Sequence, residues 1–120
     1  MGLYFNNVWL KNLILDCFDI VFEDKMIISQ LSIAPFGKDV SVSKYVKKVI
    51  KIISKYNVNY ETNAMSTVFE TEDIETIFKI IQESHILLKK NGAQRIITEL
   101  KIDDRQDKNA TMQSKLNAIQ

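Results

Sequence analysis

The sequence has little of several residue types, and each shortage excludes a class of protein. Cys17 is the single cysteine among 120 residues, so an internal disulfide is impossible and no cysteine/histidine spacing suits a zinc site. The net charge of +1 gives no broad electrostatic attraction to nucleic acid or to an anionic membrane. No apolar run reaches the roughly 18 residues of a membrane span. We therefore predict a reducing, cytoplasmic setting, with no nucleic-acid or membrane partner.

Motifs for catalysis and metal binding are equally scarce. The sequence holds no glycine-rich phosphate loop, no Gly-x-Ser-x-Gly and no His-Glu-x-x-His. His85, the only histidine, falls on the apolar stripe of a predicted helix without an acid or cysteine in register, which favours a packed, hydrogen-bonded residue. Arg105 lies inside the acidic cluster of residues 103–107, which favours internal ion pairs over a bound cation. We predict neither an enzyme nor a metal site.

A chain of this length has room for one domain with one core. We place that domain at residues 26–110. Residues 1–25 carry apolar side chains at helical spacing, and they are either an extra amphipathic helix or a disordered N-terminal extension. Residues 111–120 are either a short, weak helix or a flexible tail.

Four segments show the signals of β-strands. Residues 26–34 and 95–103 alternate between apolar and polar side chains, as half-buried strands do. Pro35 is expected to end the first of them. Residues 60–64 and 67–71 are two shorter runs that favour strand, and they form a hairpin.

Two segments between these strands have helical periodicity. The first helix runs from a cap at Ser41 or Ser43 to about Tyr56, and its lysines lie on a solvated face. The second runs from a cap at Thr71 to a stop at Gly92. The stripe that we expect this second helix to bury is Ile74, Ile77, Phe78, Ile81, His85 and Leu88.

The element order is therefore β-α-β-β-α-β. With right-handed crossovers, this order predicts an α+β, ferredoxin-like sandwich in which a four-stranded antiparallel sheet carries two helices on one face. We expect the first and last strands to be the central pair. The other face of the sheet then stays open, with a mixture of polar and apolar side chains. The polar side chains that we expect there are Gln30, Ser32, Glu99, Lys101 and Asp103.

An ordered set of short motifs resembles a known family. The motifs are Met-Ile-Ile-Ser-Gln-Leu-Ser-Ile-Ala-Pro-Phe-Gly from Met26, Ser-Val-Ser-Lys-Tyr-Val from Ser41, Met-Ser-Thr-Val-Phe-Glu from Met65, Asn-Gly-Ala-Gln-Arg from Asn91 and Lys-Ile-Asp-Asp-Arg-Gln-Asp-Lys from Lys101. Together they are similar to the small thiamine-binding proteins of bacteria, archaea and yeast. The resemblance implies a ferredoxin-like fold, homodimers or homotetramers, binding of thiamine or its hydroxymethylpyrimidine moiety, and no established catalysis. This chain departs from the family at Ser66 and Thr71, where glycine is usual.

An aminopyrimidine needs an acceptor for its amino group, donors for its ring nitrogens and an apolar or thioether surface for its flat face. Carboxylates on or beside the open face supply acceptors, neighbouring polar side chains complete the polar edge, and a methionine packs on the ring. The candidate ligand-binding residues are Gln30, Ser32, Met65, Thr67, Glu70, Glu99, Lys101 and Asp103. No cofactor is expected besides this ligand.

Two other functions fit the same fold. The first is a structural homo-oligomer without a ligand, because a semi-apolar open face on a small domain favours a second copy as its partner. The second is an RNA-recognition domain, which shares the element order but needs exposed aromatic side chains on the two central strands. Neither strand that we expect in the centre offers one. The leading hypothesis is therefore non-catalytic binding of thiamine or hydroxymethylpyrimidine, at or near an oligomer interface on the open face.

Overall fold

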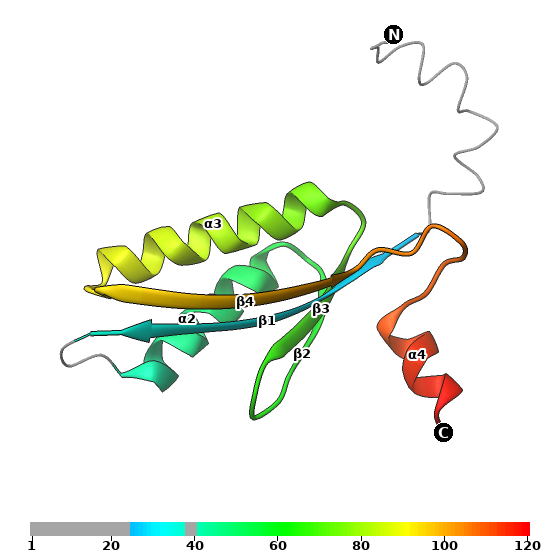
Figure 1. Ribbon diagram of the computed structural model, residues 1–120, viewed down its shortest axis with the longest axis horizontal. Coiled ribbons are helices and arrows are strands. Elements are labelled where there is room, and N and C mark those ends of the chain that lie inside the picture. Colours follow the sequence, from blue (N-terminus) through cyan, green and yellow to red (C-terminus); the bar gives the residue numbers. More distant parts are fainter. Residues whose placement is uncertain (1–24, 38–40) are drawn as a thin grey trace, which may run out of the picture.

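The computed structural model describes residues 25–37 and 41–120, so the predicted N-terminal extension lies, up to residue 24, outside the described residues. The described part of the chain follows the order β-α-β-β-α-β and ends in a further helix (Figure 1). The elements are β1 (Ile27–Phe36), α2 (Val42–Lys55), β2 (Asn59–Thr62), β3 (Thr67–Thr71), α3 (Ile74–Lys90), β4 (Arg95–Asp103) and α4 (Met112–Ala118).

The four strands form one antiparallel sheet in the order β2-β3-β1-β4. This arrangement confirms the α+β, ferredoxin-like fold predicted from the sequence. The predicted central pair is wrong, however, because β1 and β3 are central while β4 is an edge strand. Half-burial gives a strand the same alternating pattern at an edge as in the centre, so alternation could not separate the two cases.

One face of the sheet packs against α2 and α3. Phe69 of β3 and Ile53 of α2 are fully buried in this core, together with Ile77 of α3. The hydroxyl of Tyr45 donates to the backbone oxygen of Asn91 at 2.6 Å, which ties α2 to the end of α3. Apolar residues of β1 face the same way at every second position, as the sequence predicts.

The buried face of α3 is rotated from the predicted stripe. Ile80 and Ser84 are fully buried, whereas Phe78 is 53% exposed and Ile74 is 40% exposed. In a helix of 3.6 residues per turn, two adjoining stripes can both be apolar, and the docking of the helix decides which one is covered. His85 behaves as predicted, because its Nε2 atom lies 2.7 Å from the hydroxyl oxygen of Thr98 in a hydrogen bond.

The caps of the helices differ in part from the prediction. Asp73, not Thr71, caps α3, and its carboxylate accepts from the backbone N–H of Thr76 at 2.8 Å. This bond lowers the pKa of Asp73. Ser41 occupies the capping position of α2, but its side chain makes no capping bond. Gly92 ends α3 as predicted, in the left-handed conformation that glycine adopts without strain.

β1 is longer than its neighbour β3, and this difference shapes the sheet. It pairs with β3 only from Ile27 to Leu31, but with β4 as far as Phe36. The prediction that Pro35 ends the strand is therefore wrong. Proline lacks an N–H donor and is tolerated where a strand has a free edge. Pro35 lies in the part of β1 that has no partner on the β3 side.

We expect Ile80→Ala to lower the free energy of unfolding by about 2–5 kcal/mol, because it leaves a cavity in the core. Phe78→Ala, on a different face of the same helix, is the control. It should change the free energy of unfolding by less than about 1 kcal/mol, since the phenyl ring is already half exposed to solvent. Urea denaturation of both variants measures the difference. A larger loss for Phe78→Ala would show that the predicted stripe was right.

Candidate functional site

The open face of the sheet carries a hollow of about 350 Å³. It lies where β1 and β4 pass the hairpin loop between β2 and β3. Gln30 pairs with Lys101 across the two strands, and Ser32 pairs with Glu99. The residues that line the hollow are Gln30, Ser32, Met65, Ser66, Glu99, Leu100 and Lys101. Most of the predicted ligand-binding residues are thus brought together.

The loop that borders the hollow is organised by Asn63. Its side-chain oxygen accepts from the backbone N–H groups of Met65 at 2.7 Å and Ser66 at 2.9 Å. The backbone N–H of Asn63 donates to the backbone oxygen of Ser66 at 2.9 Å. Among the described non-glycine residues only Asn57 has a positive φ, so the loop accommodates Ser66 where the resembling family has glycine. Sequence analysis missed this role of Asn63, although asparagine in a short turn is a usual signal for it.

The polar groups of the hollow are not used up by the fold. Gln30 donates its side-chain amide to the hydroxyl of Ser66 at 3.0 Å, which leaves the amide oxygen of Gln30 as an acceptor. Within residues 25–37 and 41–120, the side chains of Glu99 and Lys101 take part in no hydrogen bond or ion pair. Met65 is 82% exposed. The hollow therefore offers acceptors, one cationic donor and a thioether in a small space, as a polar, flat ligand requires.

Three predicted site residues lie elsewhere. Thr67 is buried on the helix-covered side of the sheet, and its hydroxyl bonds to that of Thr62 at 3.0 Å. Glu70 and Asp103 do face the open side, but at the end remote from the hollow, where they hold the C-terminal segment. The sequence pattern put all three on or beside one face and could not show how far apart they are along the strands.

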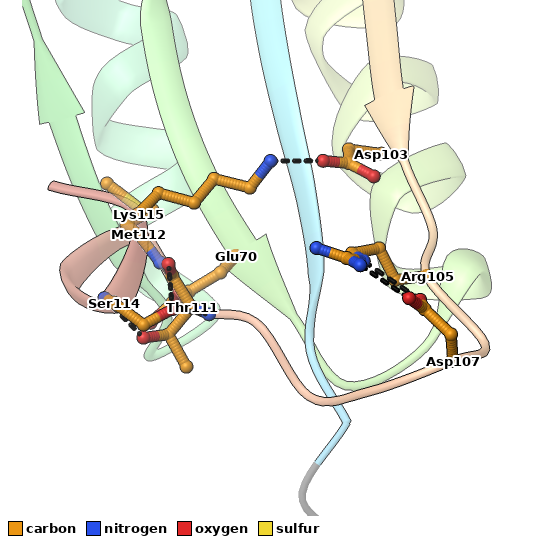
Figure 2. Close-up of polar contacts among 8 residues, drawn as sticks. All are labelled: Glu70, Asp103, Arg105, Asp107, Thr111, Met112, Ser114 and Lys115. Atoms are coloured by element: carbon orange, nitrogen blue, oxygen red, sulfur yellow. Dashed lines mark hydrogen bonds and ion pairs between the residues drawn. The ribbon is translucent and has the colours of Figure 1, made fainter. Parts of the chain in front are cut away.

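The C-terminal strap, residues 104–120, folds back over that remote end of the sheet (Figure 2). One carboxylate oxygen of Glu70 accepts from the side chain of Asn59 at 2.9 Å. Its other oxygen accepts from the backbone N–H of Met112 at 2.8 Å, at the start of α4. Glu70 is only 5% exposed. Both oxygens of this carboxylate are thus committed to the fold.

α4 depends on such contacts because a helix of 7 residues is unstable by itself in water. Thr111 and Ser114 form a capping box at its first turn. Lys115 reaches across the sheet to an ion pair with Asp103 (Figure 2), which lowers the pKa of that carboxyl. Asp103, which belongs to the family-like motif that begins at Lys101, therefore serves to dock the strap.

A second ion pair lies inside the strap. Arg105 donates to Asp107 through its Nε atom at 2.9 Å, and the guanidinium lowers the pKa of Asp107 to about 2. This confirms the prediction of internal pairing in the acidic cluster. No group of three metal-ligating side chains is placed to hold a cation within the part of the chain that the structure describes.

An apolar notch of about 190 Å³ lies on the other side of the hairpin loop. It occupies the gap in the sheet where β1 continues past the end of β3. Residues of α2 and of the loop form its walls, and Ser32, Met65 and Ser66 border both the notch and the hollow. Sequence analysis missed the apolar wall, which is made by Val42, Val46, Val49 and Ile50. Helical periodicity indicates that the apolar side chains of α2 share a face, but it does not show that they border a cavity.

Comparison with known proteins gives consistent matches. The family model described as Thiamine-binding protein matches residues 29–120. The UPF0045 protein of Methanocaldococcus jannaschii is 45% identical over 95 residues, which cover 79% of this chain and 93% of that protein. The UPF0045 protein of Methanothermobacter thermautotrophicus is 33% identical, and the match covers 78% of this chain and 96% of that protein.

Solved structures show the same fold. The crystal structure of the Methanocaldococcus jannaschii protein has a TM-score of 0.71, and the match covers 79% of this chain and 96% of that one. A candidate thiamine biosynthesis/salvage protein of Thermotoga maritima has a TM-score of 0.67 at 22% identity, and the match covers 79% of this chain and 99% of that one.

None of the helices in the described ranges is long and apolar enough to cross a membrane.

The contacts of Glu70 generate a prediction for the strap. Glu70→Gln replaces one accepting oxygen by a donor that faces another N–H, so we expect the free energy of unfolding to fall by about 1–3 kcal/mol. Glu61→Gln on exposed β2 removes the same charge and should stay within about 0.5 kcal/mol of the parent. Urea denaturation checks both values. Equal stability of the two variants would mean that Glu70 does not hold α4.

Proposed function

Because this chain belongs to the thiamine-binding protein family, we propose that it binds thiamine or the hydroxymethylpyrimidine half of thiamine and does not transform it. Membership of this family supports a thiamine-related role. The observation that carries this proposal is the hollow on the open face, where predicted ligand-binding residues converge with their polar atoms available.

The chemistry of the hollow suits the two parts of thiamine. Its thiazolium ring is a cation and its pyrimidine ring carries an amino group, so both are served by negative or accepting groups. Glu99, which lines the hollow, supplies a carboxylate that pairs with no other described residue, and the side-chain oxygen of Gln30 supplies a neutral acceptor. The thioether of Met65 can pack on a flat ring. Lys101 is a donor for the ligand's ring nitrogen or hydroxyl group.

The same geometry weakens the alternative of an RNA-recognition domain. That function needs aromatic side chains on the central strands for base stacking. With β3 rather than β4 in the centre, the side chains to consider beside those of β1 are Val68 and Glu70, which face the open side. Neither is aromatic, and Glu70 is occupied by the strap. On β1, Phe36 is the one aromatic side chain that faces the open side, and it lies at the last residue of the strand, 48% exposed. A single aromatic at a strand end is less than the pair of stacking positions on both central strands that this function uses.

We further propose that a second copy of the chain covers part of the open face, with the ligand site at or near the contact. The strap leaves Ile97 39% exposed and Met65 82% exposed on this side. Exposed apolar side chains around a polar hollow are typical of a surface that another protein covers.

Thiamine or hydroxymethylpyrimidine should raise the melting temperature of the purified, ligand-free protein. Ligand at ~100 Kd contributes about 2.7 kcal/mol to stability, which corresponds to a rise of several degrees for a domain of this size. Glu99→Gln should reduce the rise produced by thiamine, because it removes the negative charge that faces the thiazolium cation. Glu61→Gln, which changes a carboxylate outside the hollow on the same face, is the control.

The decisive measurement is differential scanning fluorimetry followed by calorimetric titration. The absence of any shift at millimolar thiamine and millimolar hydroxymethylpyrimidine would refute ligand binding. A shift that Glu99→Gln leaves unchanged would keep the function and refute the assignment of this carboxylate.

Assembly is checked separately, by light scattering at micromolar concentration. We expect a mass of two or four copies of the 13.9 kDa chain. A monomer at these concentrations would contradict the proposed interface.

A further inference from the structure

The notch beside the hairpin loop exposes a backbone edge that the sheet does not use. β1 and β3 pair one-to-one from Ile27–Thr71 to Leu31–Thr67. One further step of two residues would place Ile33 opposite Met65. Met65 instead belongs to the hairpin loop, where its N–H donates to the side chain of Asn63. Among the residues that the structure describes, Ile33 therefore has no strand partner on this side.

The direction of the backbone groups follows from the antiparallel ladder, in which alternate residues turn both N–H and C=O to the same neighbour. The carbonyl of Phe36 points to the β4 side, because it accepts from the N–H of Gln94 at 3.1 Å. Counting back along the unbroken register places the N–H and C=O of Ile33 on the opposite side, toward the notch. The hairpin gives the same answer independently. The N–H of Asn63 donates to the carbonyl of Ser66, so the backbone groups of Ser66 point toward β2 and those of the next residue, Thr67, point toward β1. Leu31, the partner of Thr67, therefore points its own backbone groups toward β3, and Ile33, two residues on, points the same way.

These two backbone groups lie at an apolar cavity. Ile33 lines the notch and is only 8% exposed. Val46, Val49 and Ile50 of α2 supply the apolar wall. Backbone N–H and C=O groups need a hydrogen-bond partner, so a ligand that pairs with both groups gains affinity and one that lacks either matching atom is penalised.

The size of the notch suits a single aromatic ring. A dry cavity of about 150 Å³ in an engineered protein accepts benzene, and the notch measures about 190 Å³. It joins the hollow along Ser32, Met65 and Ser66, which border both spaces. A ligand of two linked rings can therefore place one ring in each.

We propose that the notch is the subsite for the aminopyrimidine ring, and that this ring takes the place of the missing strand partner of Ile33. Its amino group donates to the carbonyl oxygen of Ile33, and the adjacent ring nitrogen accepts from the N–H of Ile33. The flat faces of the ring lie between the apolar wall of α2 and the loop at Met65. The rest of the ligand stays in the hollow beside Glu99. This inference rests on the proposed function, since it divides the same site into two parts.

Amide hydrogen exchange of Ile33, followed by NMR in the intact chain, tests the pairing directly. Hydroxymethylpyrimidine at ~100 Kd should slow exchange of this amide by roughly 100-fold, because exchange then requires the ligand to leave. The amide of Ile102, on the outer edge of β4, is the control and should keep its rate. A 2-methyl-5-hydroxymethylpyrimidine without the amino group should bind at least tenfold more weakly.

A second arm closes the notch. Val46→Phe should weaken the binding of hydroxymethylpyrimidine at least tenfold. Ile86→Phe, a similar enlargement at an exposed position of α3, should leave the affinity unchanged. Should Val46→Phe fail to fold, Val42→Phe fills the notch from a residue that is 49% exposed. Melting curves without ligand establish that each variant is folded.

The outcomes separate this inference from the proposed function. Binding that leaves the exchange of Ile33 unchanged overturns the subsite but keeps the function, and so does full affinity in the variants that close the notch. If neither thiamine nor hydroxymethylpyrimidine binds, both the subsite and the proposed function are overturned. Slowed exchange of Ile33 together with weakened binding on closing the notch supports both.

Discussion

The unequal length of β1 and β3 is the constraint on which the rest of the site depends. β1 has 10 residues and β3 has 5, so the second half of β1 is paired on one side only. Strand hydrogen bonds are obligatory wherever the backbone is buried, which makes such a gap costly unless something else fills it. Pro35 reduces the cost because it brings no N–H to the free edge. The hairpin loop and α2 close the gap from two sides and leave the notch between them.

The open face is divided between a structural end and an accessible end. At the structural end, the carboxylates of Glu70 and Asp103 bind residues of α4 and so hold the strap in place. At the accessible end, the carboxylate of Glu99 has no hydrogen bond or ion pair with the described part of the chain. These acids differ little as residues, and they face the same side of the sheet. Their roles diverge because a short helix needs anchors, and only the carboxylates within reach of the chain that returns from β4 can provide them.

Much of the fold could be predicted because it depends on local periodicity. The element order, the strand at residues 67–71, the face of β1 and the hydrogen-bonded role of His85 all follow from patterns that a few neighbouring residues define. The errors come from places where two local patterns compete. Ile80 and Phe78 are both apolar positions on α3, and only the packing of the helix buries the first and exposes the second. Thr71 and Asp73 can both cap a helix, and the last pairing of β3 with β1 retains Thr71 in the strand.

The sequence by itself determined which side chains share the open face, because alternation along a strand is a property of the chain alone. It determined the family, through an ordered set of motifs. Only the tertiary structure decided that β4 lies at an edge and that Glu70 serves the strap. It also decided that Ile33 turns its backbone groups to an unfilled gap. The physical reason is that these outcomes depend on where neighbouring segments end relative to one another, and the spacing of residues along one segment carries no record of where its neighbour stops.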